Sequence, residues 1–330
     1  MKITRALCSV AAFALLAGCA GGSSGVGPSG GIGQTESIAR SAIARFVAGP
    51  AVTGSIAVSS VDSGPGYYPE AAKTQPTLFV SDEQGNEVLL FPVYAKNPKP
   101  IGKITKGISV PTGLATDAAG ALYVVNDGGN SVEVFPKGST SPSLTITSGL
   151  NGPYGIAVDS KGTVYVSNLN GVNVTEYPAG KTSPSKTISE GLENPVGLGV
   201  DADDNLYIAD DSLNAIFEVK PGATKTKQLS LTGLAGPIGV QFDAAGSLYA
   251  TNFAGPNVAI YEKGASSPSR TISTGIAQPT LFGFDAKGTL FVSNQSGPIP
   301  AYEPNGSKPF ETIDSVPEPN GIASNPKLAL

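Results

Sequence analysis

The side chains that could carry chemistry in this chain are almost all oxygen donors. The sequence contains no histidine, so the usual general base at neutral pH and the commonest metal ligand are both missing. The two cysteines, Cys8 and Cys19, both lie near the N-terminus, so the rest of the chain has no disulfide, thiol nucleophile or thiolate metal site. Carboxylates, amides and hydroxyls remain, and these groups suit a hard cation such as Ca²⁺ or a polar ligand.

One set of Asp and Asn residues recurs along the chain, each at the end of a short apolar run. The set is Asp82, Asn126, Asn168, Asp210, Asn252 and Asn294. A second set follows a recurring proline, and its members best suited to binding are Tyr154 and Asn320. We expect both sets to meet at one end of the fold and form a binding site. Alternatively, the recurring Asp and Asn side chains cap loops by accepting hydrogen bonds from backbone N–H groups.

The kind of ligand depends on the role of Tyr154 and on whether the acidic residues form a metal site. Tyr154 could stack on a sugar or a peptide, or it could pack on a neighbouring part of the fold. A Ca²⁺ site needs several oxygens in a ring, and the nearest candidates are Glu318, Asn320, Asp82 and Asp210. The segment from Asp201 to Asn205 is similar to a calcium loop but lacks its glycine and terminal glutamate, so we interpret it as a turn.

An internal repeat must position these residues. Prolines recur in steps of 42 residues, with a last step of 40, at Pro111, Pro153, Pro195, Pro237, Pro279 and Pro319. Each proline begins a run in which small and apolar residues alternate. In the complete modules a turn that begins with Asp follows, ending in Gly in four of the five, and then an apolar–aromatic run. Period-two alternation predicts a strand, with its small residues on the crowded side of a radial array. Four short strands per module predict a β-propeller rather than a β-solenoid of the same period.

The two ends of the repeat fix the number of blades. Residues 77–82 resemble the second strand of a module that lacks its first strand, and residues 319–325 resemble a first strand that lacks the rest. We expect these fragments to pair and close an all-β ring, which removes an open edge. The six predicted blades of four antiparallel strands are 77–104 with 319–325, 111–146, 153–188, 195–231, 237–272 and 279–313. Residues 326–330 would form a C-terminal tail.

The module from Pro153 to Asn168, with its Pro-x-Gly-Ile-Ala-Val-Asp and Val-Tyr-Val-Ser-Asn runs, resembles the NHL repeat. The resemblance covers residues 77–325 and implies a six-bladed propeller without fixing an activity. Similar rings include lactonases that use Glu, Asn and Asp at a channel mouth, virginiamycin B lyase-like enzymes that rely on histidine, and binding or scaffold proteins. A chain without histidine cannot carry the lyase site over.

The first residues have the layout of a signal peptide. Lys2 and Arg5 precede an apolar run, Ala6 to Leu16, that is too short to span a bilayer. Leu16-Ala17-Gly18-Cys19 resembles the bacterial lipobox, which implies removal of residues 1–18 and acylation of Cys19. An ordinary secretory signal is the alternative. Since Ala20 is not aspartate, the resemblance favours the outer membrane or the cell surface.

The segment between the signal peptide and the ring, residues 19–76, is expected to be a tether. Its beginning is rich in glycine and serine, which is typical of a flexible linker. The apolar spacing is compatible with a short helix over residues 36–47. The rest of the segment is expected to be an irregular connector. The formal net charge of −5 gives no basic footprint for nucleic acid.

Two functions from different classes follow. The first is a non-catalytic ligand-binding or scaffold propeller, held at the bacterial cell envelope by the lipid on Cys19, with an unknown protein, peptide or carbohydrate ligand. The second is a lactonase-like hydrolase that depends on a divalent metal, with Ca²⁺ as the cofactor. The missing histidine and the uniform modules favour the first, without a catalytic residue or a cofactor.

Overall fold

The computed structural model describes residues 65–93, 95–96 and 98–330. The predicted signal peptide, the predicted acylation site Cys19, the expected helix over residues 36–47 and the rest of the expected tether up to residue 64 lie outside these ranges. The described part begins with a short helix, α2 (Glu70–Thr74), in a segment expected to be an irregular connector. In this part of the chain, no helix is both long and apolar enough to cross a membrane.

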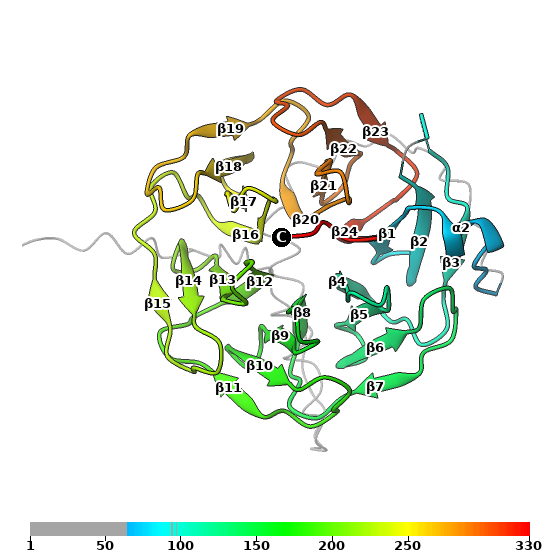
Figure 1. The fold of residues 1–330 in the computed structure, drawn as a ribbon, viewed down its shortest axis with the longest axis horizontal. Coiled ribbons are helices and arrows are strands. Elements are labelled where there is room, and N and C mark those ends of the chain that lie inside the picture. The colour runs from blue at the N-terminus through cyan, green and yellow to red at the C-terminus, as the bar shows by residue number, and fades with distance from the viewer. Residues whose placement is uncertain (1–64, 94, 97) are drawn as a thin grey trace, which may run out of the picture. The chain divides into compact units, whose positions relative to one another are not determined.

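Six four-stranded antiparallel sheets are arranged in a ring, as Figure 1 shows. Blade 1 combines β24 (Pro319–Asn325), β1 (Thr77–Asp82), β2 (Glu87–Pro92) and β3 (Gly102–Ile104). Blade 2 contains β4 (Pro111–Thr116), β5 (Leu122–Asn126), β6 (Ser131–Phe135) and β7 (Leu144–Ile146). Blade 3 contains β8 (Pro153–Val158), β9 (Val164–Asn168), β10 (Asn173–Tyr177) and β11 (Lys186–Ile188). The predicted all-β, six-bladed propeller is confirmed.

The remaining blades follow the same order from the axis outwards. Blade 4 contains β12 (Pro195–Val200), β13 (Leu206–Asp210), β14 (Ala215–Val219) and β15 (Lys227–Gln228). Blade 5 contains β16 (Pro237–Phe242), β17 (Leu248–Asn252), β18 (Asn257–Tyr261) and β19 (Arg270–Ile272). Blade 6 contains β20 (Pro279–Phe284), β21 (Leu290–Asn294), β22 (Ile299–Tyr302) and β23 (Glu311–Ile313).

The C-terminal strand closes the ring as predicted. Strand β24 is the innermost strand of blade 1 and pairs antiparallel with β1, with Leu78 opposite Ser324 and Phe79 opposite Ala323. In Figure 1 the last strand, in red, lies directly beside the first, in blue. The first blade is therefore assembled from both ends of the repeat.

The small residues of the innermost strands allow neighbouring backbones to approach closely. A Cβ added to Gly155 would lie 2.2 Å from the Val196 carbonyl oxygen in the next blade, and one on Gly197 would lie 2.2 Å from the Ile238 oxygen. The apolar residue between the small positions faces the other way. Ile156 packs with blade 2, and Leu198 packs with blade 3. The alternation seen in the sequence therefore separates two different interfaces.

A buried hydroxyl on the second strand of the blade links it to the next blade at three of these interfaces. Ser167 Oγ accepts a hydrogen bond from the Gly155 amide at 2.8 Å and donates to the Val196 carbonyl at 2.6 Å. Ser81 in blade 1 and Thr251 in blade 5 do the same with their own neighbours. Each hydroxyl sits where the inner strand bulges away from regular pairing. It satisfies backbone groups that the bulge would otherwise leave without partners.

The turn between the first two strands of a blade depends on an Asp, as predicted. In blade 3, Asp159 Oδ1 accepts hydrogen bonds from the amides of Lys161 and Thr163 at 2.9 and 2.8 Å, and Gly162 has a φ of +80°. In blades 2 and 4 the second carboxylate oxygen accepts a hydrogen bond from a tyrosine on the following strand, in the pairs Asp117–Tyr123 and Asp201–Tyr207. In blades 3 and 5, Tyr165 and Tyr249 occupy the same position and interact with Asp159 and Asp243.

Blade 6 lacks this Asp–Tyr pair, so a substitution there can test what the pair contributes to stability. Phe291 occupies the tyrosine position, and the buried Asp285 Oδ2 has no hydrogen-bond partner among the described residues. A buried acceptor without a partner costs about 1–3 kcal/mol. Phe291→Tyr should restore the pair and raise the unfolding free energy by about 1 kcal/mol, measured by urea denaturation. Tyr123→Phe removes such a pair in blade 2, so it is the matched control and should lower the unfolding free energy. A Phe291→Tyr protein no more stable than the parent would contradict this account.

Candidate functional site

The recurring Asp and Asn residues at the ends of the second strands are buried and hydrogen-bonded to loop backbone. Asn126 Oδ1 accepts from the Ser109 amide at 3.0 Å, and its Nδ2 donates to the Gly107 carbonyl at 2.7 Å. Asp210 Oδ2 accepts from the amides of Glu193 and Asn194. Asn168, Asn252 and Asn294 each accept an amide hydrogen bond from the loop that precedes the inner strand of their own blade, and Asp82 accepts one from the Glu318 amide. This is the geometry of loop capping.

The residue after each cap is only partly buried, so it is the one available to a ligand. These residues are Glu83, Asp127, Leu169, Asp211, Phe253 and Gln295. Each of them directly follows a residue that the sequence predicts for the binding site. The recurring Asp and Asn indicate these positions in the sequence. A side chain that caps its own loop is not free to contact a ligand, so the next residue of the loop is the better candidate.

Asn320 and Tyr154 meet at this end of the channel. Asn320 Nδ2 donates a hydrogen bond to a Glu83 carboxylate oxygen and lies 3.0 Å from the Tyr154 hydroxyl. The same hydroxyl lies 3.1 Å from Asn320 Oδ1. Asn320 belongs to the closing strand of blade 1, whereas Tyr154 belongs to blade 3, so this contact joins the inner strands of two blades that are not adjacent. Tyr154 is therefore tied into a polar network at the channel mouth.

Burial and like charge make this mouth unfavourable for ionised carboxylates. Burial raises the pKa of Glu83 to about 7, with Glu318, Asp127 and Asp82 adding to the rise, while the hydrogen bond from Asn320 opposes it. Burial also raises the pKa of Asp211, and the nearby Asp210 adds to that rise. The pKa values of Asp82 and Glu318 are raised by burial too. A positively charged group placed here would relieve this cost.

The face that contains the mouth is strongly acidic. Because the strands of each blade alternate in direction, the loops after the second strands and those before the inner strands open on one face. Their acidic residues are Asp82, Glu83, Asp127, Glu190, Glu193, Asp210, Asp211, Asp314 and Glu318. Within these loops, all of which the structure describes, the basic residue is Lys106. The turns of the opposite face mix lysines with acids, so the two faces differ in charge.

The four residues considered for a metal site are not arranged as one. Asp82 and Asp210 use carboxylate oxygens to accept backbone amide hydrogen bonds, and Asn320 is bonded to Glu83 and Tyr154. Among the described residues, no three acidic side chains are grouped as cation ligands. The donor set therefore does not fit a Ca²⁺ ion as it stands.

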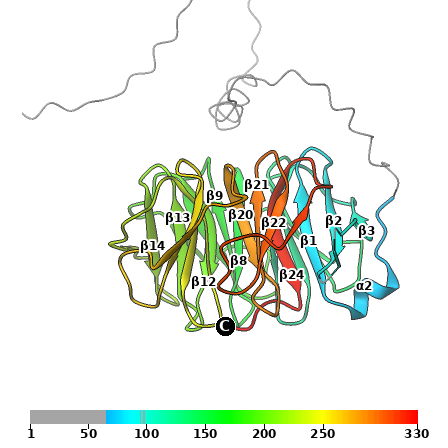
Figure 2. The same ribbon diagram turned by 90° about the horizontal axis from the view of Figure 1, so that it is seen from above.

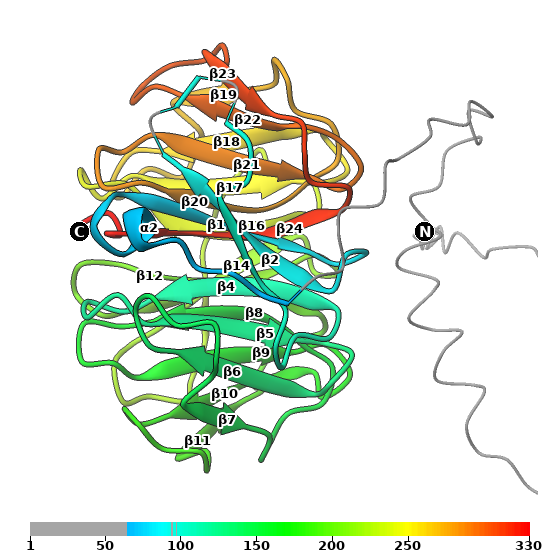
Figure 3. The same cartoon turned by 90° about the vertical axis from the view of Figure 1, so that its right-hand side faces the viewer.

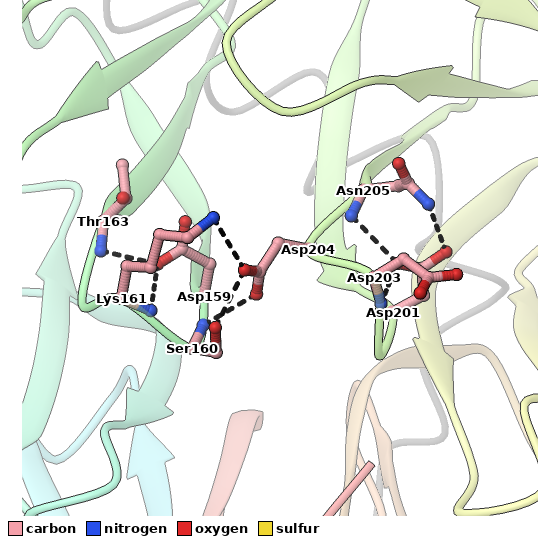
Figure 4. A network of polar contacts seen from close by, with 8 residues as sticks. All are labelled: Asp159, Ser160, Lys161, Thr163, Asp201, Asp203, Asp204 and Asn205. Atoms are coloured by element: carbon pink, nitrogen blue, oxygen red, sulfur yellow. Dashed lines mark hydrogen bonds and ion pairs between the residues drawn. The ribbon is translucent and has the colours of Figure 1, made fainter.

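The segment from Asp201 to Asn205 forms the turn between β12 and β13, on the face opposite the mouth. Figure 4 shows its side chains from close by. Asp201 Oδ1 accepts hydrogen bonds from the amides of Asp203 and Asn205 at 3.0 and 2.9 Å. Asp204 instead reaches blade 3, where it accepts from the Ser160 amide and hydroxyl and lies 3.1 Å from Lys161 Nζ. The cluster is thus a turn joined to its neighbour by an inter-blade clasp.

Comparison with known proteins identifies the architecture. The sequence matches no family model and no curated protein. A chain of the nidogen/laminin complex has a TM-score of 0.66 at 20% identity and covers 76% of this chain and 98% of its own length. An inactive virginiamycin B lyase of Staphylococcus aureus, in which alanine replaces a histidine, has a TM-score of 0.54 at 15% identity and covers 78% and 90%. A protein of unknown function from Bacteroides caccae has a TM-score of 0.58 at 11% identity and covers 76% and 99%.

These structural similarities show the fold alone, because the sequence identities are all low. They agree with the six-bladed ring that the repeat predicts. The resemblance to the NHL repeat stays a prediction, as do the lipobox and the choice between a binding protein and an enzyme.

The raised pKa of Glu83 predicts a pH dependence of stability. The folded protein holds a proton on Glu83 between its ordinary pKa of 4.5 and about 7, whereas the unfolded chain releases it. Stability from this group is therefore fully present below pH 4.5 and is lost as the pH rises towards 7. Glu83→Gln keeps an acceptor for Asn320 and removes the charge. It should raise the unfolding free energy at pH 8 by on the order of 1–2 kcal/mol and change it little at pH 4.

Urea denaturation of both proteins at the two pH values measures this difference. Glu303→Gln, at an exposed site on the opposite face, is the control and should be neutral at both. Equal effects of Glu83→Gln at pH 4 and pH 8 would contradict the assigned burial of this carboxylate.

Proposed function

We propose that this protein is a non-catalytic binding propeller, displayed at the bacterial cell envelope by a lipid on Cys19, that engages its ligand at the acidic mouth. The observation that carries the binding part is the hydrogen-bonded contact between Glu83, Asn320 and Tyr154 at the channel entrance. The neighbouring carboxylates with raised pKa values make the same place a poor environment for anions and a favourable one for a cationic group.

The proposed ligand is a basic surface or segment of a protein. Complementary charge speeds encounter and selects partners of opposite sign, and the mouth face carries its acidic residues in the loops of blades 1, 2 and 4. A structural neighbour from a nidogen/laminin complex supports the use of such rings as protein-binding modules. The partly buried Leu169 and Phe253, which lie among the acidic positions of the ring, would give a partner apolar contacts beside the charged ones.

The absence of histidine from the chain supports a non-catalytic role. The similar lyase is described as inactive once a histidine is replaced, and this chain has no such residue to supply. The lactonase-like alternative has less support, because its candidate ligands already bond to backbone amides and to one another.

The anchor is tested by lipid labelling in a bacterial host. Cells fed an alkyne-bearing fatty acid should label the full-length protein and retain it in the membrane fraction. Cys19→Ala should abolish labelling and release the protein from the membranes, whereas Cys8→Ala should change neither. Equal labelling of the Cys19→Ala protein would contradict acylation at this residue.

The binding face is tested by photo-crosslinking in intact cells. A photoreactive phenylalanine analogue replaces Gln84 or Asn170 on the mouth face, or Ala119 or Ala244 on the opposite face, all exposed positions. We expect adducts from the first pair, and we expect Asp127→Asn combined with Asp211→Asn to reduce them by about threefold or more.

The matched control removes two charges from the other face with Glu262→Gln and Glu303→Gln, both exposed, and should leave the adducts unchanged. Adducts that form only from Ala119 or Ala244, or that respond equally to both pairs of substitutions, would contradict the proposed face.

A further inference from the structure

The other end of the channel holds a cavity that the proposed function does not use. Its volume is about 300 Å³, and it lies where the inner strands meet the first turn of each blade. All six inner strands contribute to its wall. Apolar residues in that wall, one from each inner strand, are Leu114, Ile156, Leu198, Phe242, Phe284 and Ile322. Pockets that hold small molecules in proteins are typically concave and mostly apolar in this way.

The C-terminal tail crosses the opening of this cavity. Figure 1 shows the C-terminus at the centre of the ring, and Figure 2 shows it on one face. Figure 3 shows β24 running through the ring to that side. Lys327, Leu328, Ala329 and Leu330 form part of the cavity lining. The tail therefore forms one wall of the cavity, and among the described residues it is the wall that does not belong to a blade.

Few contacts hold the tail in place. Lys327 makes an isolated backbone bridge with Asp285, and the partly buried Leu328 packs on the cluster that contains Tyr249 and Phe284. Leu330 is 47% exposed. A terminal segment with so few buried contacts opens at a small cost in free energy compared with unfolding of the ring.

The polar side chains that the blades contribute to the cavity wall are paired within the protein, whereas Lys327 adds a charged side chain from the tail. Asp204 bonds to Ser160 and Lys161 in the clasp of Figure 4. Both carboxylate oxygens of Asp201 accept hydrogen bonds within its own turn and strand. Gln241 Nε2 donates to the Phe282 carbonyl at 2.9 Å. A ligand that entered here would find apolar walls and would gain little from carrying a charge.

We propose that this end of the channel binds a small uncharged apolar molecule, with Leu328–Leu330 as a displaceable lid. The ligand would replace the apolar contacts that the tail makes and would bury more apolar surface than the tail does, because it can fill the cavity behind it. The lid lowers the apparent affinity, since only the open fraction of molecules can bind. This site lies on the face opposite the acidic mouth and is independent of the proposed function.

The test uses N-phenyl-1-naphthylamine, an uncharged probe that fluoresces in apolar surroundings. The full chain should bind the probe saturably. Deleting Leu328–Leu330 should tighten the dissociation constant by about fivefold or more, because the lid no longer competes. Leu328→Asp combined with Leu330→Asp should act in the same direction without shortening the chain. Melting curves without the probe show that each variant retains the ring.

Energy transfer from an introduced tryptophan shows where the probe binds. The chain contains no tryptophan of its own, so the introduced one is the only tryptophan donor. Ala202→Trp puts a donor on a turn at the edge of the cavity, whereas Asn170→Trp puts one on the mouth face. Bound probe should quench the first donor strongly and the second much less. The Glu83→Gln substitution should leave probe binding unchanged.

Several results would overturn the proposal. They are no saturable binding by the shortened protein, equal quenching of both donors, or stronger quenching of the donor at position 170. Probe binding only by the shortened or charged-tail proteins would support it, because the lid would then be closed in nearly all full-length molecules.

Discussion

The close approach of six inner strands around one axis is the constraint on which this structure depends. Between blades 3 and 4 and between blades 4 and 5, the place where a Cβ would stand is 2.2 Å from a neighbouring carbonyl oxygen. The same crowding recurs where the ring closes, since a Cβ on Gly321 would lie 2.3 Å from the Thr112 oxygen. Glycine at these positions is therefore a requirement of the ring itself. Buried hydroxyls and inter-blade apolar clusters then fill the space that the crowding defines.

The crowding also shapes the two ends of the channel in different ways. At one end the inner strands carry Tyr154 and Asn320, which bond to each other, and Asn320 also bonds to Glu83, so the entrance is polar and surrounded by carboxylates. At the other end the inner strands leave an apolar cavity that the chain covers with its own C-terminus. One ring thus offers two chemically distinct surfaces.

The sequence was sufficient for the architecture and only partly sufficient for the site. The recurring prolines and the alternation of small and apolar residues predict the inner strands, because those patterns follow directly from strand geometry and crowding. The role of Ser167 as a link between blades depends on a bulge that no local pattern reveals. Glu83 was not predicted. The carboxylate of Asp82 bonds to loop backbone, so the next residue along the chain is the one that is partly exposed at the mouth. The lid could not be predicted, since nothing in Lys327–Leu330 specifies where a terminal segment docks.

Closure of the ring by β24 is the central claim, and thermal unfolding tests it most directly. Deleting residues 317–330 removes the inner strand of blade 1, which exposes the edge of β1 and the faces of β4 and β20 that pack against it. The melting temperature should fall by at least about 10 °C, with loss of a single cooperative transition. Deleting only Leu328–Leu330 should leave the melting temperature nearly unchanged. An unaltered melting temperature after the longer deletion would contradict a ring that depends on its last strand.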